Sequence, residues 1–355
     1  MTETEKKAVG RYLDWHTGIL LETDGKMGIY RKESGKLIYK EKADSEDGYL
    51  GMYLFLMGKY LEKTESTDLP EYWKKGISLA LKKIQSLMQD GITQVSEENT
   101  TVYLMDNLEV WKGLYELEHA GLKDVQAIRE MRNKLQAQIE KLFWDDANQR
   151  WRIIENSDLY HQKEFYPDGV AQIYPLIYEF PVKEKKKQKI LYEQFTEKFQ
   201  WQKLNKKRNG FLWAMTGMAA AQMGDINNLL EMIRNYEAEY CENRKYPLYT
   251  GEAGWICMEC EKLYSLYEKN KDMILALEAM DYSPYRNDNN VSMYSDGKLF
   301  FNELLESLKK AKKSINIEFY IFKNDDIGTK ILNVLEEKAK EGVEVRLLYD
   351  SVGSR

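Results

Sequence analysis

The sequence is poor in several features, and each absence narrows the class of protein. Its three cysteines, Cys241, Cys257 and Cys260, leave an odd thiol, so a disulfide framework is not expected. No apolar run approaches the roughly 18 residues that a membrane helix requires. The first ten residues also lack the apolar segment of a secretory signal. We therefore predict a cytoplasmic protein without a membrane span.

Positive charge is not in excess either. The chain has 52 Lys and Arg residues against 58 Asp and Glu residues, a net charge of −6 over 355 residues, so we expect no nucleic-acid partner. The histidines, His16, His119 and His161, are too scattered to indicate a metal site. Cys257 and Cys260 form a C-x-x-C, but neither a second ligand pair nor a βαβ context accompanies it. We predict no metal and no cofactor, and the sequence does not indicate an oligomeric state.

Most of the sequence has a residue pattern that is compatible with α-helices. Only six prolines occur, and apolar residues recur at steps of three and four over long stretches. The pattern predicts a β-hairpin over residues 27–39, and helices over residues 3–16, 47–63, 71–89, 103–120, 123–143, 169–179, 185–199, 211–223, 225–239 and 251–269. Paired helices without a fixed repeat favour an (α/α)6 toroid of six helical hairpins, with one or two helices missed or lost.

Near residue 275 the pattern changes to an alternation of strands and helices. It predicts a mostly parallel α/β arrangement, with strands at 291–293, 314–322 and 343–349 and helices at 298–312 and 328–340. Turn-forming and polar residues over 281–290 indicate a boundary. We therefore predict a mainly α toroid over residues 1–275, a linker over 276–290 and a partial α/β segment over 291–355.

The C-terminal stretch, from NNVSMYSDGK to VRLLYDSVGSR, resembles the start of the first catalytic domain of bacterial cardiolipin synthases, in the phospholipase D superfamily. The Ser-Pro-Tyr turn at Ser283–Tyr285 is similar too. In that family one histidine of an H-x-K-x4-D motif attacks phosphorus and a second protonates the leaving alcohol. That motif lies downstream of the matching stretch, and the chain ends at Arg355 before it. The resemblance implies an inactive fragment, or alternatively the front part of a membrane-lipid enzyme.

One H-x-K-x4-D pattern does occur, formed by His161, Lys163 and Asp168. It precedes the α/β segment instead of following it. It also lacks the glycine pair that follows the motif in the family. We interpret the match as coincidence.

A second resemblance begins at the densest acidic helix start. Ser45–Met52, SEDGYLGM, is similar to the S-E-G-Q-G-Y-G-M motif of family 8 glycoside hydrolases, which have an (α/α)6 fold and use this Glu as general acid. The resemblance implies that role for Glu46, although the spelling departs at Asp47 and Leu50. Acidic residues are favoured at any helix N-terminus, so simple capping is the alternative for Glu46.

Two further motifs follow in the order of that family. Residues 105–110, MDNLEV, resemble its D-A-D-L-D-I-A helix, whose acidic residues hold the sugar, which implies Asp106 or Glu109. Residues 166–172, YPDGVAQ, resemble its Y-D-A-x-R-x-P stretch and imply that Asp168 activates the water. Gln172 stands near the place of the expected arginine. Helix capping is again the alternative for Asp168.

The resemblance implies inverting hydrolysis of a glucan-type poly- or oligosaccharide, with Glu46 as acid and Asp168 or Asp106 as base. Such chemistry needs a protonated carboxyl and an ionised carboxylate, roughly 6.5 to 9.5 Å apart. The expected partner is this carbohydrate, and the candidate substrate-binding residues are Tyr49, Glu109, Tyr166, Glu252 and Trp255. Most buried aromatic residues belong to the core, and Glu252 can equally cap a helix. The alternative function is a non-catalytic carbohydrate-binding or scaffold toroid.

Overall fold

The computed structural model describes most of the chain, namely residues 2–34, 36–66, 69–155, 157, 164–204, 213–243, 249–269, 294, 296–350 and 353–354. It contains two compact units, Met1–Asp272 and Met273–Arg355, and each is treated by itself below. The strand predicted at 291–293 lies outside the described residues, as do His161 and Lys163.

Unit 1 is built from helices, as the periodicity predicts. Its α-helices are α1 (Glu3–Glu22), α2 (Glu46–Thr64), α3 (Glu71–Leu87), α4 (Leu104–Glu118), α5 (Gln126–Phe143), α6 (Val170–Ile177), α7 (Lys185–Phe199), α8 (Thr216–Met223), α9 (Ile226–Tyr236) and α10 (Thr250–Lys269). The first helix runs past its predicted end because Thr17 and Leu20 continue the buried stripe begun by Leu13. The mainly α fold is confirmed, and the described part of unit 1 holds five helical hairpins of the six expected.

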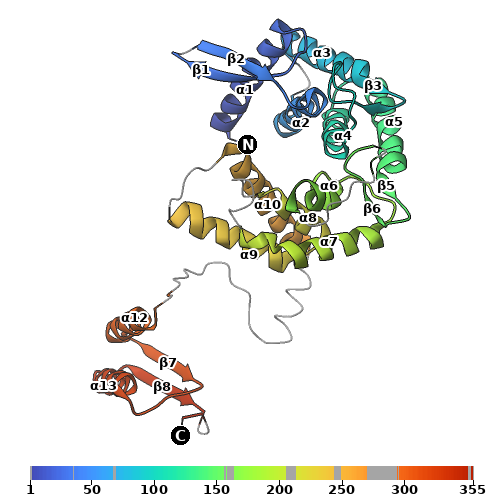
Figure 1. Ribbon diagram of the computed structural model, residues 1–355. Helices are drawn as coiled ribbons and strands as arrows, with labels where there is room; N and C mark the ends of the chain where they lie inside the picture. Colours follow the sequence, from blue (N-terminus) through green and yellow to red (C-terminus); the bar gives the residue numbers. More distant parts are fainter. Residues whose placement is uncertain are drawn as a thin grey trace. The chain divides into compact units, whose positions relative to one another are not determined.

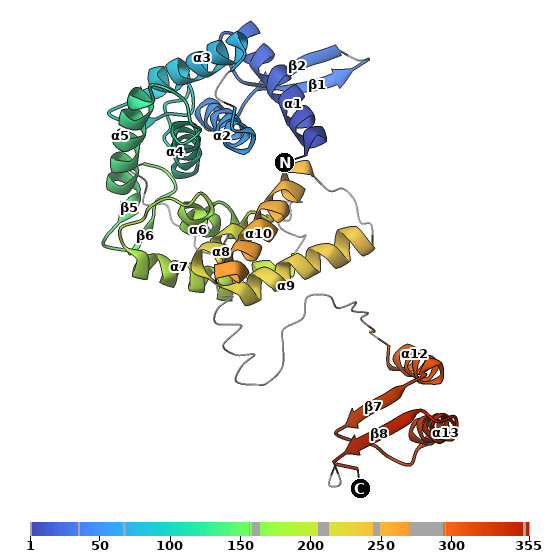
Figure 2. The ribbon, with the colours of Figure 1, turned by 180° about the vertical axis from the view of Figure 1, so that it is seen from behind.

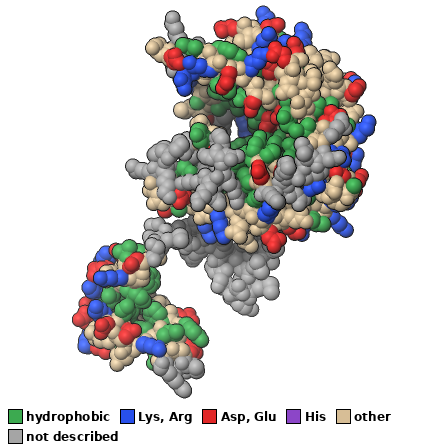
Figure 3. Space-filling model, viewed as in Figure 1, with side chains coloured by type: hydrophobic (Ala, Val, Ile, Leu, Met, Phe, Trp, Pro, Cys, Tyr) green, Lys and Arg blue, Asp and Glu red, His purple; other side chains and the backbone are tan. Residues whose placement is uncertain are grey.

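Successive helices alternate between an outer and an inner layer, so each hairpin contributes one helix to each layer (Figures 1 and 2). The inner helices are α2, α4, α6, α8 and α10, and each contacts the next in this order. The outer helices are α1, α3, α5, α7 and α9. Lys63 of α2 donates a 2.8 Å hydrogen bond to Glu261 of α10, so the first and last inner helices are also joined. This is the toroidal arrangement that the helix pairing predicts. Figure 3 shows hydrophobic side chains around the central opening of unit 1.

Helices α2 and α4 approach each other closely at their glycines. A Cβ atom added to Gly113 would lie 2.1 Å from the backbone oxygen of Gly51, and one added to Gly51 would lie 2.6 Å from the Cα of Val110. Only glycine permits the two backbones to come this close. This close approach holds α2 and α4 together, and both helices carry acidic residues in their first turns.

Short hairpins interrupt the helices of unit 1. The predicted hairpin is β1 (Gly28–Glu33) paired antiparallel with β2 (Lys36–Lys42). Two further hairpins consist of two-residue strands, β3 (Met88–Gln89) with β4 (Ile92–Thr93) and β5 (Trp144–Asp145) with β6 (Arg150–Trp151). These were not predicted, because two residues are too few to show an alternating pattern. A π-helical turn, η1 (Phe165–Gly169), precedes α6.

Unit 2 has the α/β pattern that the sequence predicts. Its elements are α12 (Gly297–Lys310), β7 (Ser314–Phe319), α13 (Asp326–Lys340) and β8 (Glu344–Tyr349). The two strands pair in parallel, from Ser314 opposite Glu344 to Phe319 opposite Tyr349. Its small core comprises Leu308, Ile315, Ile331, Val334, Leu335 and Val343. None of the described helices in either unit is long and apolar enough to cross a membrane.

Candidate active site

Acidic residues from three inner helices meet in one pocket. Asp44 lies just before α2, Asp106 lies in the first turn of α4, and Asp168 lies in the turn before α6. They line a cavity of about 460 Å³, called here the acid pocket, whose lining is Asp44, Ser45, Tyr103, Met105, Asp106, Ile153, Ile154, Ser157, Tyr166, Pro167 and Asp168. The amino ends of α2, α4 and α6 thus face the same pocket. Helix amino ends favour carboxylates, which explains why acidic residues gather there.

Asp106 is the carboxyl of the pocket whose proton affinity changes most clearly. Burial raises its pKa to about 8, and the nearby carboxylates of Asp47, Glu109 and Asp44 act in the same direction. A hydrogen bond with Ser45 opposes the rise only in part. The Asp106 carboxyl therefore holds a proton near neutral pH. A carboxyl of this kind is suited to donating a proton to a leaving group.

Glu109 lies one helical turn after Asp106 on α4. Burial raises its pKa to about 7, although the hydroxyl of Tyr174 donates a 2.7 Å hydrogen bond to Glu109 Oε1 and lowers it in part. The hydroxyl of Tyr178 lies 3.4 Å from the same oxygen. On the other side, a Cβ added to Gly48 would lie 2.6 Å from Glu109 Oε2. The Glu109 carboxyl is therefore enclosed between α2 and α6.

Asp47 is fully buried behind the pocket. Ser45 Oγ donates to Asp47 Oδ1 at 2.9 Å, and Thr93 Oγ1 lies 2.7 Å from Asp47 Oδ2. Thr93 Oγ1 also lies 2.8 Å from Asn107 Oδ1, which accepts a hydrogen bond from the Thr93 backbone N–H. A threonine hydroxyl has one hydrogen, so Thr93 donates to only one of these two oxygens at a time. Burial raises the pKa of Asp47, and its hydrogen bonds with Thr93 and Ser45 oppose the rise.

Glu46 does not join these carboxyls. It lines a separate pocket of about 40 Å³ with Lys26, Lys42, Lys83, Ser96, Glu97 and Glu98. Burial raises its pKa, and the charges of Lys42 and Lys83 oppose the rise. Consecutive helix residues point about 100° apart, so Asp47 faces the α4 side while Glu46 faces the β1–β2 hairpin and α3. The expectation that Glu46 would share a site with Asp106 and Asp168 is therefore corrected.

The remaining candidates occupy different positions. Tyr166 lines the acid pocket and packs on Trp213, with ring centroids 4.9 Å apart. Tyr49 is 39% exposed in the first turn of α2. Glu252 accepts a 2.7 Å hydrogen bond from the backbone N–H of Ala214, two residues before α8 begins. Trp255 lies away from the acid pocket.

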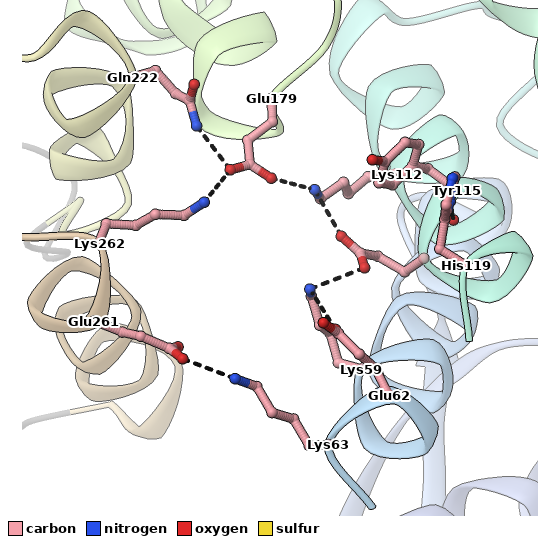
Figure 4. Close-up of polar contacts among 11 residues, drawn as sticks. Lys59, Glu62, Lys63, Lys112, Tyr115, His119, Glu179, Gln222, Glu261 and Lys262 are labelled. Carbon is pink, nitrogen blue, oxygen red and sulfur yellow. Dashed lines mark hydrogen bonds and ion pairs between the residues drawn. The ribbon is translucent and has the colours of Figure 1, made fainter. Parts of the chain in front are cut away.

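Trp255 lines a second cavity inside the ring, of about 420 Å³, near the carboxyl ends of the inner helices. Its ring contacts that of Tyr178 at 6.0 Å between centroids. Around this cavity three lysines and three glutamates form a connected network of ion pairs, drawn in Figure 4: Lys59, Lys112, Lys262, Glu62, Glu116 and Glu179. Lys63 and Glu261 form a separate pair beside it. Lysines at helix carboxyl ends complement the helix dipoles.

Sequence reasoning missed Asp47, Thr93, Asn107, Tyr174 and Tyr178. One signal was available on α4, where Asp106, Glu109, Lys112 and Glu116 recur at steps of three and four residues within an apolar helix. Polar residues that recur on one face of a buried helix indicate that this face lines a cavity. The tyrosines carried no signal, because their contact with Glu109 joins segments 65 residues or more apart.

The described residues contain no group of three or more His, Cys, Asp or Glu placed to hold a metal ion. Cys241, Cys257 and Cys260 are free thiols at exposed positions.

Similarity to known proteins is concentrated in a short stretch. A cardiolipin synthase of Clostridium perfringens (strain 13) is 47% identical over 93 residues, which are 26% of this chain and 20% of that protein. The major cardiolipin synthase of Bacillus subtilis is 44% identical over 86 residues, which are 24% of this chain and 18% of that protein. The chain thus spans about a fifth of the length of the curated relatives it matches. The resemblance to cardiolipin synthases is confirmed for a stretch of this length.

Two solved structures resemble the chain distantly. A glycosidase variant has a TM-score of 0.45 and 12% identity, covering 72% of this chain and 80% of its own. A rhamnosidase from Klebsiella oxytoca with rhamnose bound has a TM-score of 0.42 and 11% identity, covering 62% of this chain and 42% of its own. No family model matches the chain.

Proposed function

We propose that unit 1 hydrolyses glycosidic bonds of a glucan-type poly- or oligosaccharide in the acid pocket, with Asp106 as general acid and Asp168 as general base. The observation that carries the proposal is that these two carboxyls come from different inner helices and line the same 460 Å³ cavity. Two carboxyls on opposite sides of a bond are what glycoside hydrolysis requires. Tyr103 and Tyr166 in the lining supply flat rings on which a sugar can stack.

The roles follow from the surroundings of each carboxyl. Because the pKa of Asp106 is raised to about 8, this side chain carries the proton that the leaving oxygen needs. Asp168, only 7% exposed, faces the pocket from the α6 side and would remove a proton from the attacking water. If that water occupies the space between the two groups, the anomeric configuration inverts. Glu109 and Asp47 would act by keeping Asp106 protonated.

Unit 2 is proposed to contribute no phosphatidyl transfer. Residues 291–355 contain no histidine, whereas the cardiolipin synthase resemblance implies a histidine nucleophile.

The test is reducing-sugar release from soluble α- and β-glucans, xylan and chitosan, using the full chain. We expect Asp106→Asn and Asp168→Asn each to lower kcat by roughly 10²- to 10⁴-fold, the usual contribution of a general acid or base. Glu46→Gln is the matched control, because its carboxyl neighbours the cluster in sequence but lies in another pocket. We expect this variant to keep activity. The anomer formed first, followed by NMR, reports inversion.

Three results would contradict the proposal. Loss of activity in Glu46→Gln alone would return the acid role to the residue that the sequence motif implies. Full activity in Asp106→Asn would remove the proposed acid. Absence of release from every substrate by the folded wild type would favour the non-catalytic carbohydrate-binding toroid.

A further inference from the structure

Three aromatic side chains on α1 and α2 are exposed to solvent over a large part of their surface. Tyr12 is 48% exposed, Trp15 is 40% exposed and Tyr49 is 39% exposed. Their accessible area belongs to flat rings, and none of the three belongs to the buried core of unit 1. These three residues are called here the aromatic platform.

The platform is supported from below by other rings. Tyr12 and Trp15 lie 5.4 Å apart between centroids, and His16 packs against both, at 5.7 and 5.9 Å. The ring of Tyr53 packs against that of His16, with the two centroids 5.1 Å apart. The Tyr53 hydroxyl is fixed by a 2.8 Å hydrogen bond with Thr17. A supported ring loses little conformational entropy on binding, which is what a stacking surface for a ligand requires.

The platform is also uncharged. His16 is the one titratable cation in this ring stack, and burial lowers its pKa to about 4. It is therefore neutral at physiological pH, and its Nδ1 atom is buried without a hydrogen-bond partner among the described residues. A neutral surface of rings suits a ligand with apolar faces and no net charge.

Tyr49 connects the platform with the acid pocket. It lies four residues after Ser45, which lines the pocket. It also lies four residues before Tyr53, whose ring packs on His16 of α1, so residues one helical turn apart on α2 lead from the pocket to the platform. On the opposite side of the pocket, Tyr166 is 41% exposed. Accessible rings therefore flank the acid pocket on two sides.

We propose that a neutral glycan chain held in the acid pocket continues over α1, where Trp15 and Tyr12 bind sugar units beyond the bond that is cleaved. The proposal rests on the carbohydrate substrate of the proposed function and adds a preference for long chains. The carboxyls of Asp44 and Asp168, which line the acid pocket, disfavour a polyanionic chain there. A neutral sugar polymer offers polar edges to the carboxyls and apolar faces to the rings.

The test measures binding without turnover. Asp106→Asn serves as the background, and affinity for soluble mixed-linkage β-glucan and pullulan is compared with affinity for cellobiose and maltose by calorimetry and affinity electrophoresis. We expect Trp15→Ala to weaken polysaccharide binding by about tenfold, because it removes one stacking ring, and to leave disaccharide binding unchanged. Trp15→Phe keeps a ring and should restore most of the affinity. Tyr264→Ala, at a 65% exposed position on α10, is the matched control.

Several results would overturn the proposal. Equal polysaccharide affinity in Trp15→Ala and the background overturns the proposal, and so does absence of binding to every probe. Binding without hydrolysis by the wild type would refute the hydrolase function while leaving the platform open to the same comparison. A dimer in sedimentation that dissociates in Trp15→Ala would identify the platform as an interface between two copies and would overturn the glycan proposal. Far-UV circular dichroism confirms that each variant is folded.

Discussion

Lys112 Nζ of α4 lies 2.7 Å from Glu179 Oε2, just beyond α6, and equally 2.7 Å from Glu116 Oε1 on its own helix. The Lys112 side chain is only 5% exposed, so this ion pair joins two inner helices inside the ring. Burial by itself would raise the pKa of Glu179, but Lys112 and Lys262 lower it to about 2. The network in Figure 4 is thus centred on one buried lysine.

Replacing this lysine should destabilise unit 1. Lys112→Met leaves Glu116 and Glu179 with less compensating charge, and breaking a buried pair costs about 3 kcal/mol in the free energy of unfolding. Because the pKa of Glu179 is lowered, its contribution is present above pH 4.5 and is lost as the pH falls toward 2. The control is Lys63→Met, whose pair with Glu261 has side chains 48% and 64% exposed and should contribute less than about 1 kcal/mol. Equal urea midpoints for the two variants would contradict this ranking.

The pH dependence of hydrolysis tests the role of Asp47. If Asp106 is the acid, kcat/KM falls on the alkaline side as Asp106 ionises, with a midpoint near its pKa of about 8. After burial, the Asp47 charge is the largest cause that raises this pKa. Asp47→Asn removes the charge at nearly unchanged volume, so the alkaline limb should move to lower pH. The measurement is the kcat/KM profile from pH 4 to 10.

Asn107→Ala is the comparison for that experiment. It removes a neighbour of Thr93 without removing a carboxylate, so it should lower stability and leave the alkaline limb in place. An unchanged limb in Asp47→Asn would show that the two carboxyls do not interact in the way proposed.

The helical layout and part of the site could be predicted from the sequence. Apolar steps of three and four residues locate the helices, because each helix buries one face. Asp106, Tyr166 and Asp168 follow from motifs at helix starts, and the structure brings those starts to one pocket. The three motifs lie far apart in the sequence. They line one cavity because α2, α4 and α6 pack with their amino ends on the same side.

The orientation of neighbouring residues could not be predicted. Glu46 and Asp47 are consecutive helix residues, so their side chains point about 100° apart. The sequence alone does not determine which of the two faces the neighbouring helix, because helix boundaries are uncertain by one or two residues. The motif spelling selected Glu46, whereas packing against α4 buries Asp47. The Tyr174 and Glu109 contact depends on how α6 lies against α4, which no local pattern determines.

Asp106 should also lower stability at alkaline pH. Its folded pKa of about 8 lies above the ordinary value of 3.8, so between these values the unfolded chain is ionised and the folded chain is protonated. Unfolding then releases a proton, and rising pH favours it. Asp106→Asn mimics the protonated form and removes this cost, with a gain of about 1 to 3 kcal/mol at pH 8 and almost none at pH 4.

Thermal unfolding of both proteins, followed by circular dichroism at pH 4, 6 and 8, measures this gain. Asp124→Asn, at an exposed position outside the acid pocket, controls for a general effect of removing one negative charge. A stability difference between Asp106→Asn and wild type that does not grow with pH would show that Asp106 ionises normally in the folded chain.

The crossing of α2 and α4 predicts a strong effect from a single methyl group. In Gly113→Ala the new Cβ would lie 2.1 Å from the Gly51 oxygen, a backbone atom that moves only if the helices separate. Overpacking of this kind costs about 3 kcal/mol in the free energy of unfolding, and it would also shift Asp106 and Glu109 relative to α2. Gly18→Ala is the matched control, since nothing lies within 4 Å of its Cβ position, and it should stabilise α1 by about 0.5 to 1 kcal/mol. Urea unfolding of the two variants gives opposite signs if the close approach is real, and equal small shifts would mean that α2 and α4 do not touch at Gly113.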